Sequence, residues 1–500
     1  MGIDAYEVGV ETDMGSGLPG VNIVGLPDMA IKESKDRIRA AIKNSGFSFP
    51  SKKITINLAP ADIRKEGAWL DLPIALSILC SEGLIEPSAV TDMVFCGELS
   101  LDGKLKPMKG VLPIAMSIRT MGKNKLLLPH ENSKEAATVN DISVYGLNSL
   151  KETVDFLNRK IEISPREPIE YYEFKKNVRH RMDFSDVKGQ EHVKRGLEVA
   201  ASGGHNVLLI GPPGSGKSML AKRLVTVLSE MTLTESLETS KIHSVAGLIS
   251  PNKCLITARP FRSPHHTISY AALVGGGTNP APGEISLAHN GVLFLDELPE
   301  FKRDALEVLR QPLEEGRITI SRISDTLTYP CKFMLVAAMN PCPCGYFTDP
   351  KRQCRCTPFQ IQRYLSKISG PLLDRIDIHI EVPRLNLETI TEKRRGESSE
   401  SIRKRVDSAR AIQKDRYKND GILFNAHLES KELERYCLFD KESEELLKLA
   451  ILELGISARA YDKILRISRT IADLEGSATI EAHHVSEAIS YRSLDRNLWG

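Results

Sequence analysis

Two short stretches of the chain carry residues suited to bind and split a nucleoside triphosphate. The first, Gly211-Pro212-Pro213-Gly214-Ser215-Gly216-Lys217-Ser218, fits the pattern G-x-x-x-x-G-K-[ST] and stands between an apolar run and a helix-like segment. Its glycines let successive backbone N–H groups face phosphates at a helix N-terminus. Lys217 would add a positive charge at the outer phosphates, and Ser218 a hydroxyl for Mg²⁺. We therefore predict that this loop binds ATP with Mg²⁺.

The second stretch, Gly291-Val292-Leu293-Phe294-Leu295-Asp296-Glu297, is an apolar run that ends in two carboxylates. Asp296 is predicted to hold Mg²⁺ together with Ser218. Glu297 is predicted to polarise the attacking water, because hydrolysis of a γ-phosphate depends mainly on positioning and charge stabilisation. Two acids after a strand usually belong to a solvated loop, but the phosphate-binding loop earlier in the chain favours the catalytic interpretation.

Two further side chains are predicted to complete the site. Asn340 ends the apolar run 336–339 and is suited to orient the same water. Arg375, in Leu372-Leu373-Asp374-Arg375-Ile376-Asp377, is predicted to reach the ATP of a neighbouring subunit. Such an arginine finger contributes roughly 10³ to 10⁵ in rate. The alternative is a local ion pair between Arg375 and Asp377.

Four of the nine cysteines lie close together in a turn-rich segment: Cys342, Cys344, Cys354 and Cys356. Four thiolates suit tetrahedral Zn²⁺, although the C-x-C spacing is tighter than the usual C-x₂-C. We predict a structural zinc site, with an unliganded cysteine cluster as the alternative. The scattered cysteines are expected to be buried as small apolar side chains in a reducing compartment.

Composition places little constraint on partners. Sixty-seven basic and sixty-five acidic residues leave a net charge of +2, so a nucleic-acid surface would have to come from local clustering. The chain has no run of eighteen apolar residues, and its first residues include acids and glycines where a signal peptide would be apolar. We expect a cytoplasmic protein without a membrane partner.

The elements that position these residues are predicted to form an α/β fold. Within residues 184–385, the runs 207–210, 292–295 and 333–338 have the continuous apolar character of strands in a parallel sheet covered on both faces. This predicts a P-loop ATPase core with the cysteine-rich insert at 342–356.

Three other regions surround this core. Residues 1–160 mix short strands with helical stretches such as 28–45 and 70–82, which predicts an α+β domain. Residues 161–183 are polar and contain prolines, which is typical of a linker. Residues 386–500 are charged and predicted to be a helical domain, with helices over 397–418, 444–474 and 480–490.

These motifs resemble those of the AAA+ family, and more narrowly of the magnesium-chelatase-like ComM/YifB proteins. The narrower resemblance spans nearly the whole chain. It rests on Arg259-Pro260-Phe261-Arg262-Ser263-Pro264-His265-His266, Gly275-Gly276-Gly277 and Pro282-Gly283-Glu284-Ile285-Ser286-Leu287-Ala288-His289-Asn290. It implies that Asn340 is sensor 1, Arg375 the finger acting in trans, and Arg459 the nucleotide-binding sensor 2 arginine of a C-terminal helical lid. A surface ion pair is the alternative for Arg459.

The resemblance also implies a homo-oligomeric, hexameric ring that acts as an ATP-driven DNA motor in branch migration during recombination and natural transformation. The strand pair around Arg317-Ile318-Thr319-Ile320-Ser321-Arg322 looks like the hairpins that point into such a ring's pore. Arg317 and Arg322 could track the backbone of single-stranded or branched DNA, or could be ordinary solvated charges. His265 and His266 could contact nucleic acid or a metal, but a structural role is more common for such a pair.

Residues 1–160 resemble the Lon-protease-like, ChlI-type domain of ComM proteins through Lys65-Glu66-Gly67-Ala68-Trp69-Leu70-Asp71-Leu72-Pro73 and Gly97-Glu98-Leu99-Ser100-Leu101-Asp102-Gly103. Trp69 stands where the serine nucleophile would be and Leu112 where the lysine would be, so we do not expect peptidase activity. The domain is expected to bind a partner or DNA, or to organise the ring. The chain begins later than is usual in this family, and a first β-strand is expected to be missing.

Two other functions remain open. The chain could be the ATPase of a metal-insertion complex that acts with another subunit on a porphyrin, or a scaffold that uses ATP only as a conformational switch. The cysteine cluster and the Lon-like domain favour the DNA motor, because the chelatase ATPase subunit is generally shorter and lacks both.

Overall fold

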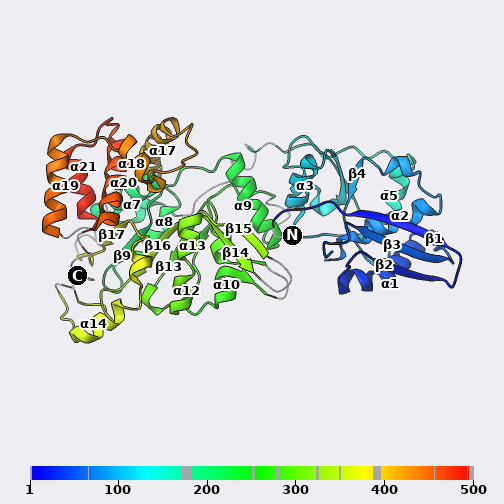
Figure 1. Cartoon of the computed structure of the whole chain (residues 1–500), viewed down its shortest axis with the longest axis horizontal. Helices are drawn as coiled ribbons and strands as arrows, with labels where there is room; N and C mark the ends of the chain where they lie inside the picture. The colour runs from blue at the N-terminus through cyan, green and yellow to red at the C-terminus, as the bar shows by residue number, and fades with distance from the viewer. Residues whose placement is uncertain are drawn as a thin grey trace. The chain divides into compact units, whose positions relative to one another are not determined.

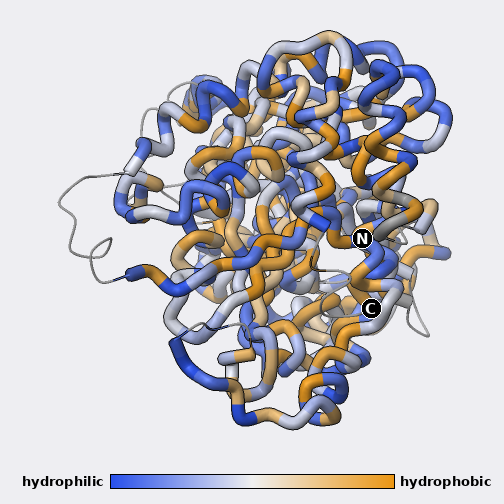
Figure 2. The backbone as a smooth tube through the Cα atoms, turned by 90° about the vertical axis from the view of Figure 1, so that its left-hand side faces the viewer, coloured by the Kyte–Doolittle hydropathy of each residue, from blue (hydrophilic) through white to orange (hydrophobic). Residues whose placement is uncertain are grey.

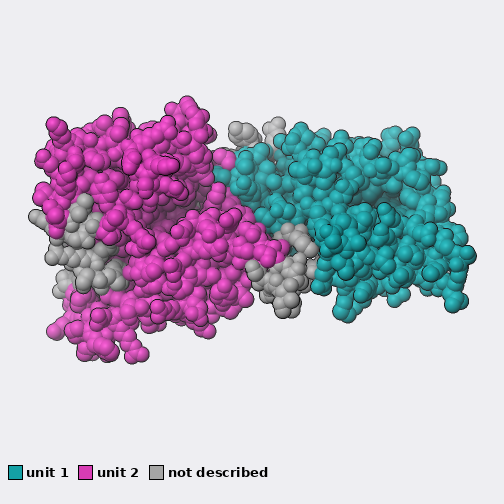
Figure 3. Space-filling model, viewed as in Figure 1, with its two compact units in different colours: residues 1–178, 233–257 teal, residues 179–232, 258–500 magenta. Residues whose placement is uncertain are grey.

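The computed structural model forms two compact units, coloured separately in Figure 3. The first unit comprises residues Met1–Val178 and Leu233–Thr257, and the second comprises Arg179–Thr232 and Ala258–Gly500. The structure describes residues 3–65, 67–169, 171, 182–249, 254–277, 281–321, 326–347, 349, 351–386, 396–454, 457–492 and 494.

The second unit is built on a parallel sheet with the strand order β10-β13-β16-β9-β17 (Figure 1). The strands are β9 (Val207–Ile210), β10 (Phe261–Arg262), β13 (Val292–Leu295), β16 (Met334–Met339) and β17 (Ile378–Glu381). Every residue of β9, β13 and β16 is buried, which explains their unbroken apolar runs. Helix α7 (Glu191–Gly203) contacts β17, and α8 (Lys217–Leu224) contacts β16. The predicted parallel sheet is confirmed.

The C-terminal part of the second unit is helical, as predicted. Its helices are α17 (Ser399–Arg416), α18 (Ser430–Tyr436), α19 (Lys441–Leu454), α20 (Ala458–Glu475) and α21 (Ala482–Ser490). The stretch predicted as one helix over 444–474 therefore contains two. Helix α20 packs on α7, and apolar residues of these helices share one core with the sheet. Figure 2 shows hydrophobic and hydrophilic stretches alternating along the chain.

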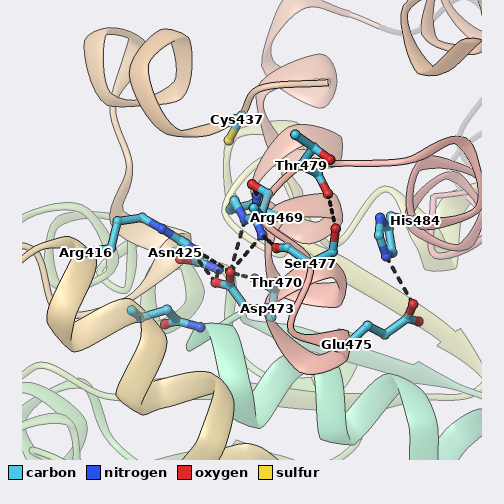
Figure 4. Close-up of polar contacts among 12 residues, drawn as sticks. Arg416, Asn425, Cys437, Arg469, Thr470, Asp473, Glu475, Ser477, Thr479 and His484 are labelled. Carbon is cyan, nitrogen blue, oxygen red and sulfur yellow. Dashed lines mark hydrogen bonds and ion pairs between the residues drawn. The ribbon is translucent and has the colours of Figure 1, made fainter. Parts of the chain in front are cut away.

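A buried polar network holds these helices together (Figure 4). The carboxylate of Asp473 on α20 accepts hydrogen bonds from three side chains, those of Arg416, Asn425 and Arg469. Asn425 also donates to Thr470 Oγ1 at 3.0 Å. Because every buried charge here has a partner, the network can be accommodated in the core.

The same network reaches the edge of the sheet where β9 and β17 begin. His205 Nε2 lies 2.8 Å from Thr470 Oγ1, and His205 Nδ1 lies 3.4 Å from Asp377 Oδ2. Burial alone would raise the pKa of Asp377, but the hydrogen bond from His205 and the nearby positive charges lower it to about 2. The C-terminal helices are thus tied to the segment that precedes β17.

The first unit is an α+β arrangement, as predicted for residues 1–160. One sheet has the order β1-β3-β2 and another the order β4-β7-β8, and β5 pairs with β6. The strands are β1 (Gly9–Gly15), β2 (Gly20–Val24), β3 (Lys53–Ala59), β4 (Met93–Phe95), β5 (Glu98–Leu99), β6 (Leu105–Lys106), β7 (Lys125–Pro129) and β8 (Ser143–Leu147). The helices α1 (Met29–Asn44), α2 (Asp71–Ser81), α3 (Val111–Thr120), α4 (Ser133–Ala136) and α5 (Leu150–Leu157) accompany them.

Helix α9 (Leu233–Val245) belongs to the first unit, whereas the sequence predicts a single domain over 184–385. Leu237 and Leu255 pack against the apolar core of that unit, and Ser244 Oγ donates to Glu135 at 2.5 Å. The segment therefore leaves the ATPase fold because its partners lie in the first unit. Among the described residues, no helix has the length and apolar character needed to cross a bilayer.

Candidate nucleotide site

The phosphate loop joins β9 to α8 and requires its glycines. Gly214 and Gly216 have φ values of 77° and 97°, in the left-handed region that favours glycine. A Cβ on Gly211 would lie 2.2 Å from the carbonyl oxygen of Val382. The loop can therefore come close to β17 and still present backbone N–H groups at the start of α8, where an anion is favoured.

A cavity of about 380 Å³ lies over this loop. Three neighbouring strands, β9, β16 and β13, end at it, so the parallel sheet brings together groups that are far apart in the sequence. The lining residues are Pro213, Gly214, Ser215, Gly216, Lys217, Ser218, Met219, Asp296, Glu297, Met339 and Asn340.

Lys217 is buried beneath the cavity. Its Nζ donates to the carbonyl oxygens of Gly211 at 2.7 Å and Pro212 at 3.0 Å, and to Asn340 Oδ1 at 3.1 Å. Burial lowers the pKa of Lys217 to about 8, although the charges of Asp296 and Glu297 oppose this shift. A phosphate group here would favour the charged form again. Asn340, predicted to orient the water, thus lies beside Lys217, which is predicted to bind phosphate.

The predicted magnesium ligands meet at the same cavity. Ser218 Oγ donates to Asp296 Oδ2 at 2.5 Å, and the other carboxylate oxygen accepts from the backbone N–H of Glu297 at 3.0 Å. A hydroxyl and a carboxylate are oxygen donors of the kind that Mg²⁺ prefers. The donor set therefore fits Mg²⁺ held between these two side chains and the phosphates of a nucleotide.

Glu297 occupies an unusual backbone conformation at the rim of the cavity. Its φ of 53° is in the left-handed region, which non-glycine residues rarely adopt and which is often found at functional sites. Its side chain is 57% exposed, and Oε2 lies 3.4 Å from His266 Nδ1. The sequence singles out His266 only as one of a pair of histidines, and does not connect it with Glu297.

Gln190 is a residue of the site that sequence reasoning missed. Its Nε2 donates to the backbone oxygens of Ser215 at 2.9 Å and Pro383 at 3.0 Å. It thereby ties the start of α7 to the phosphate loop and to the end of β17. The only sequence signal is Gly189-Gln190, a turn before a helix, which gives no information about the partner in space.

Arg375 lies at the opposite edge of the sheet from the phosphate loop. Asn206, directly before β9, donates to the carbonyl oxygen of Arg375 at 2.8 Å. The loop follows the other end of β9, and four strand residues span about 13 Å. The guanidinium donates to the carbonyl oxygen of Pro371 at 2.7 Å and to Glu314 at 2.5 Å. The alternative ion pair with Asp377 is not formed, since Asp377 faces His205.

Arg459 is found in the first turn of α20, near the same edge. Its side chain is 75% exposed and pairs with Asp374 at 2.9 Å, one residue before Arg375. It is not among the residues that line the described cavity. In this conformation the surface ion pair describes Arg459, and its role as sensor 2 stays a prediction.

The cysteine cluster has the geometry of a four-thiolate site. The sulfur of Cys342 lies 3.3 Å from that of Cys344 and 3.7 Å from that of Cys354, and those two are 3.5 Å apart. Cys356 completes a group whose ligand atoms lie within 4.8 Å of one another. Tetrahedral Zn²⁺ with Zn–S bonds of about 2.3 Å needs sulfurs about 3.8 Å apart. The donor set therefore fits zinc.

The cysteine loop also touches the phosphate loop. Gly345 has a φ of 83°, and a Cβ there would lie 2.5 Å from Pro213 Cδ. Cys342 follows Asn340 by two residues. Although burial opposes charge on Cys344, backbone N–H groups of Arg355 and Tyr346 lower its pKa to about 6. Burial raises the pKa of Cys342 to about 12, so of these two thiols only Cys344 has the thiolate character that favours metal binding.

A second group of possible ligands fits a metal poorly. Glu475, His483 and His484 lie close together, and Figure 4 shows His484 facing Glu475. However, His484 Nδ1 accepts from the backbone N–H of Glu481 at 2.9 Å, so its Nε2 carries the proton and donates to Glu475 at 3.2 Å. A metal at Nε2 would need the lone pair of that nitrogen.

The predicted hairpin is formed by β14 (Arg317–Ser321) and β15 (Thr326–Pro330). Ile318 and Tyr329 are buried on one face, while Arg317 is 64% exposed and pairs with Glu315 at 3.0 Å. Arg322, the other predicted DNA contact, lies outside the described residues.

The two positions compared with a Lon-type dyad hold packing side chains. Trp69 lies in the turn Ala68–Leu70 and packs partly buried against two apolar clusters, and Leu112 is buried in α3. The Lon-like interpretation of this unit stays a prediction.

Comparison with known proteins agrees with these features. Residues 183–390 match the family "Magnesium chelatase, subunit ChlI", residues 10–132 match "Subunit ChlI of Mg-chelatase", and residues 396–492 match "Magnesium chelatase, subunit ChlI C-terminal". The chain is similar to "Competence protein ComM" of Haemophilus influenzae, with 45% identity over 502 residues that cover 100% of this chain and 97% of that protein.

Two further relatives are similar over almost the whole chain. YifB of Escherichia coli K12 is 44% identical, with 100% of this chain and 96% of that protein covered. Rv2897c of Mycobacterium tuberculosis is 40% identical, with 98% and 96% covered. From its site geometry and these full-length matches, the chain belongs to the magnesium-chelatase-like ComM/YifB family of AAA+ proteins.

Proposed function

We propose that the protein hydrolyses ATP and uses the energy to move along single-stranded or branched DNA as a ring-forming motor. The observation that carries the ATPase proposal is the single cavity at which Lys217, Ser218, Asp296, Glu297 and Asn340 converge. In their proposed roles Lys217 grips the phosphates, Ser218 and Asp296 hold Mg²⁺, and Glu297 and Asn340 act on the attacking water.

The ring proposal is supported by the position of Arg375. This arginine lies at the edge of the sheet opposite its own phosphate loop, so it could complete only the site of another subunit. Arg459 lies beside Asp374 near that edge, and we assign it to the same neighbouring nucleotide. Each chain would then contribute its phosphate loop to one site and its arginines to the next, which a closed ring, such as a hexamer, satisfies for every subunit.

The DNA proposal has two supports. It is supported by the exposed, polar outer face of the β14–β15 hairpin with Arg317, and by the similarity to a competence protein. We propose a structural role for zinc at the cysteine loop. A cytoplasmic location is proposed as well, in keeping with nine cysteines that form no disulfide, all of which lie among the described residues.

A mixing experiment tests the shared site. Lys217→Ala should lose nucleotide binding but keep the arginine finger, Arg375. Arg375→Ala should bind ATP, but its ATPase rate should fall about 10³-fold. Either variant alone is expected to be inactive, and a mixture of the two should recover part of the wild-type ATPase rate because some interfaces then join an intact loop to an intact finger. Arg310→Ala, which removes a nearby arginine paired with Glu307, is the control and should stay active.

The outcomes separate the candidate functions. A mixture that stays inactive, while both variants assemble with ATP, would contradict the shared site. ATPase activity stimulated by forked or single-stranded DNA supports the motor, and stimulation only by a second protein supports the metal-insertion alternative. Wild-type protein that neither binds nor hydrolyses ATP with Mg²⁺ would contradict the proposal as a whole.

A further inference from the structure

The cysteine loop and the helix that follows it carry a local cluster of basic side chains. That helix is α14 (Pro358–Leu365), at the periphery of the second unit (Figure 1). Residues 342–367 contain five basic residues and one acidic residue, whereas the whole chain has 67 and 65. A nucleic-acid surface on a chain with so little net charge requires such clustering. The basic residues are Lys351, Arg352, Arg355, Arg363 and Lys367.

Three of these cations are exposed to solvent. Within the described part of the chain, no carboxylate pairs with Arg352, Arg355 or Arg363. Arg352 instead lies over the ring of Tyr346, with 4.2 Å between its guanidinium carbon and the ring centroid. The acid of the segment, Asp349, has a side chain that is 1% exposed, so it cannot pair with them at the surface. Exposed guanidinium groups of this kind can bind phosphate through paired N–H donors.

Helix α14 places an aromatic ring beside one of these arginines. Phe359, in its first turn, is 72% exposed, which is unusual for such a large apolar side chain. Arg363 follows four residues later, so the two side chains share the outer face of the helix. The opposite face, with Tyr364 and Leu365, is buried and fixes the helix on the unit. An exposed ring next to cations is the combination by which proteins bind single strands, with bases stacked on the ring and phosphates at the cations.

Charge favours a nucleic acid over a protein as the partner of this face. A protein would need a carboxylate for each unpaired arginine, whereas a single strand offers a phosphate and a base at every nucleotide. Zinc with four thiolates would be negative, but the surplus of basic side chains exceeds its charge. Because Arg352 and Arg355 lie between Cys344 and Cys356, bound zinc would also hold both arginines in place.

The α14 surface is defined here by four exposed residues, Arg352, Arg355, Phe359 and Arg363. We propose that the α14 surface binds single-stranded DNA, with the arginines at phosphates and Phe359 stacked on a base. The inference rests on the proposed DNA function and adds a contact surface to the β14–β15 hairpin. It predicts little sequence preference, because every base has a face on which a ring can stack.

The test is binding of a labelled thymidine oligonucleotide to the full chain, measured by fluorescence anisotropy with a non-hydrolysable ATP analogue present. Phe359→Ala should weaken binding about tenfold, because one stacked base is lost. Phe359→Tyr should bind like the wild type, whereas Phe359→Leu should bind like Phe359→Ala, because leucine keeps the apolar character but has no ring. Arg363→Ala should weaken binding and reduce its dependence on salt, because one phosphate contact is lost.

Two exposed residues of the same unit serve as controls. Leu452 in α19 is 81% exposed and matches Phe359, and Lys414 in α17 is an exposed cation that matches Arg363. Leu452→Ala and Lys414→Ala should both bind like the wild type.

Three results would overturn the inference. The first is wild-type affinity in both Phe359→Ala and Arg363→Ala, and the second is equal affinity in Phe359→Leu and Phe359→Tyr. The third is loss of assembly in these variants, measured by size in the ATP analogue, which would make the surface a contact between copies of the chain. A wild-type protein that binds no single strand at low salt would instead contradict the proposed DNA function itself.

Discussion

At the scale of single residues, the site is a set of polar groups that are held by hydrogen bonds within the chain. Lys217 is bound by backbone carbonyls and by Asn340, and the hydroxyl of Ser218 is bound by Asp296. Each of these contacts can be exchanged for a contact with a phosphate or with Mg²⁺. The lowered pKa of Lys217 shows that burial opposes its charge until an anion arrives.

The lowered pKa of Lys217 predicts how nucleotide affinity depends on pH. The pKa of unliganded Lys217 is about 8, and a bound triphosphate should raise it. The dissociation constant for a non-hydrolysable MgATP analogue should therefore stay level from about pH 7 to 8. Above that it should rise towards tenfold per pH unit, because the neutral amine must first take up a proton. Titration calorimetry across this range measures the effect.

Lys217→Arg is the matched control, because a guanidinium stays charged throughout this range. Its affinity can be lower than that of the wild type, but it should not change between pH 7 and 9. Parallel curves for the two proteins would mean that another group causes the pH dependence.

At the scale of elements, the sequence predicted the strands and loops that depend on the local pattern of apolar and turn-forming residues. The buried strands β9 and β13 were located to the residue, and β16 to within one residue, because unbroken apolar runs bounded by turns are characteristic of such strands. Asp296 and Asn340 were predicted to act on the same nucleotide and water, and they line one cavity because neighbouring parallel strands end at the same edge of the sheet. The G-x-x-x-x-G-K-[ST] motif correctly predicted the strand before the loop, the turn in the loop and the helix after it.

What the sequence could not show depends on register and packing. The contact of His266 with Glu297 lies beyond the two residue pairs that join β10 to β13, so no sequence pattern brings these side chains together. Gln190 acts on backbone atoms that no pattern identifies. Helix α9 was given to the wrong unit because its partners are apolar residues of α3, far away in the sequence.

The cysteine loop gives a prediction at this scale. Replacing Cys344 and Cys354 by serine should remove bound zinc, because thiolates supply most of the affinity of such sites. The affinity for the ATP analogue should fall as well, since Gly345 of this loop packs against Pro213 of the phosphate loop. Metal analysis and calorimetry on the same preparation measure both effects.

Cys80→Ala is the control, because Cys80 is a partly buried thiol of the first unit outside the cluster. It should leave zinc content and nucleotide affinity unchanged. Equal zinc content in the double variant and the wild type would refute the metal site. Lost zinc with unaltered nucleotide affinity would limit its role to the loop itself.

At the scale of the whole molecule, the two ends of the strands in the parallel sheet have different proposed roles. The carboxyl edge holds the chain's own phosphate loop, and the amino edge holds Arg375 near Arg459. Helix α20 joins this edge to the C-terminal helices, because Lys463 donates to the carbonyl oxygen of Ile376 at 3.1 Å. A movement of those helices would therefore be passed to Arg375, the residue that we propose reaches the nucleotide of a neighbouring subunit.

If the β14–β15 hairpin contacts DNA in the assembled protein, we expect the affinity for DNA and its salt dependence to change when Arg317 is removed. If Arg317 contacts a phosphate, Arg317→Ala should weaken binding equally for all sequences and reduce the slope of log affinity against log salt by about one for each subunit in contact. Arg435→Ala is the control, because Arg435 is as exposed as Arg317, at 68%, and also pairs with a carboxylate, that of Asp420. Fluorescence anisotropy of labelled single strands over a range of salt concentrations measures both slopes. Equal slopes for the two variants and the wild type would mean that DNA, where it binds, uses another surface.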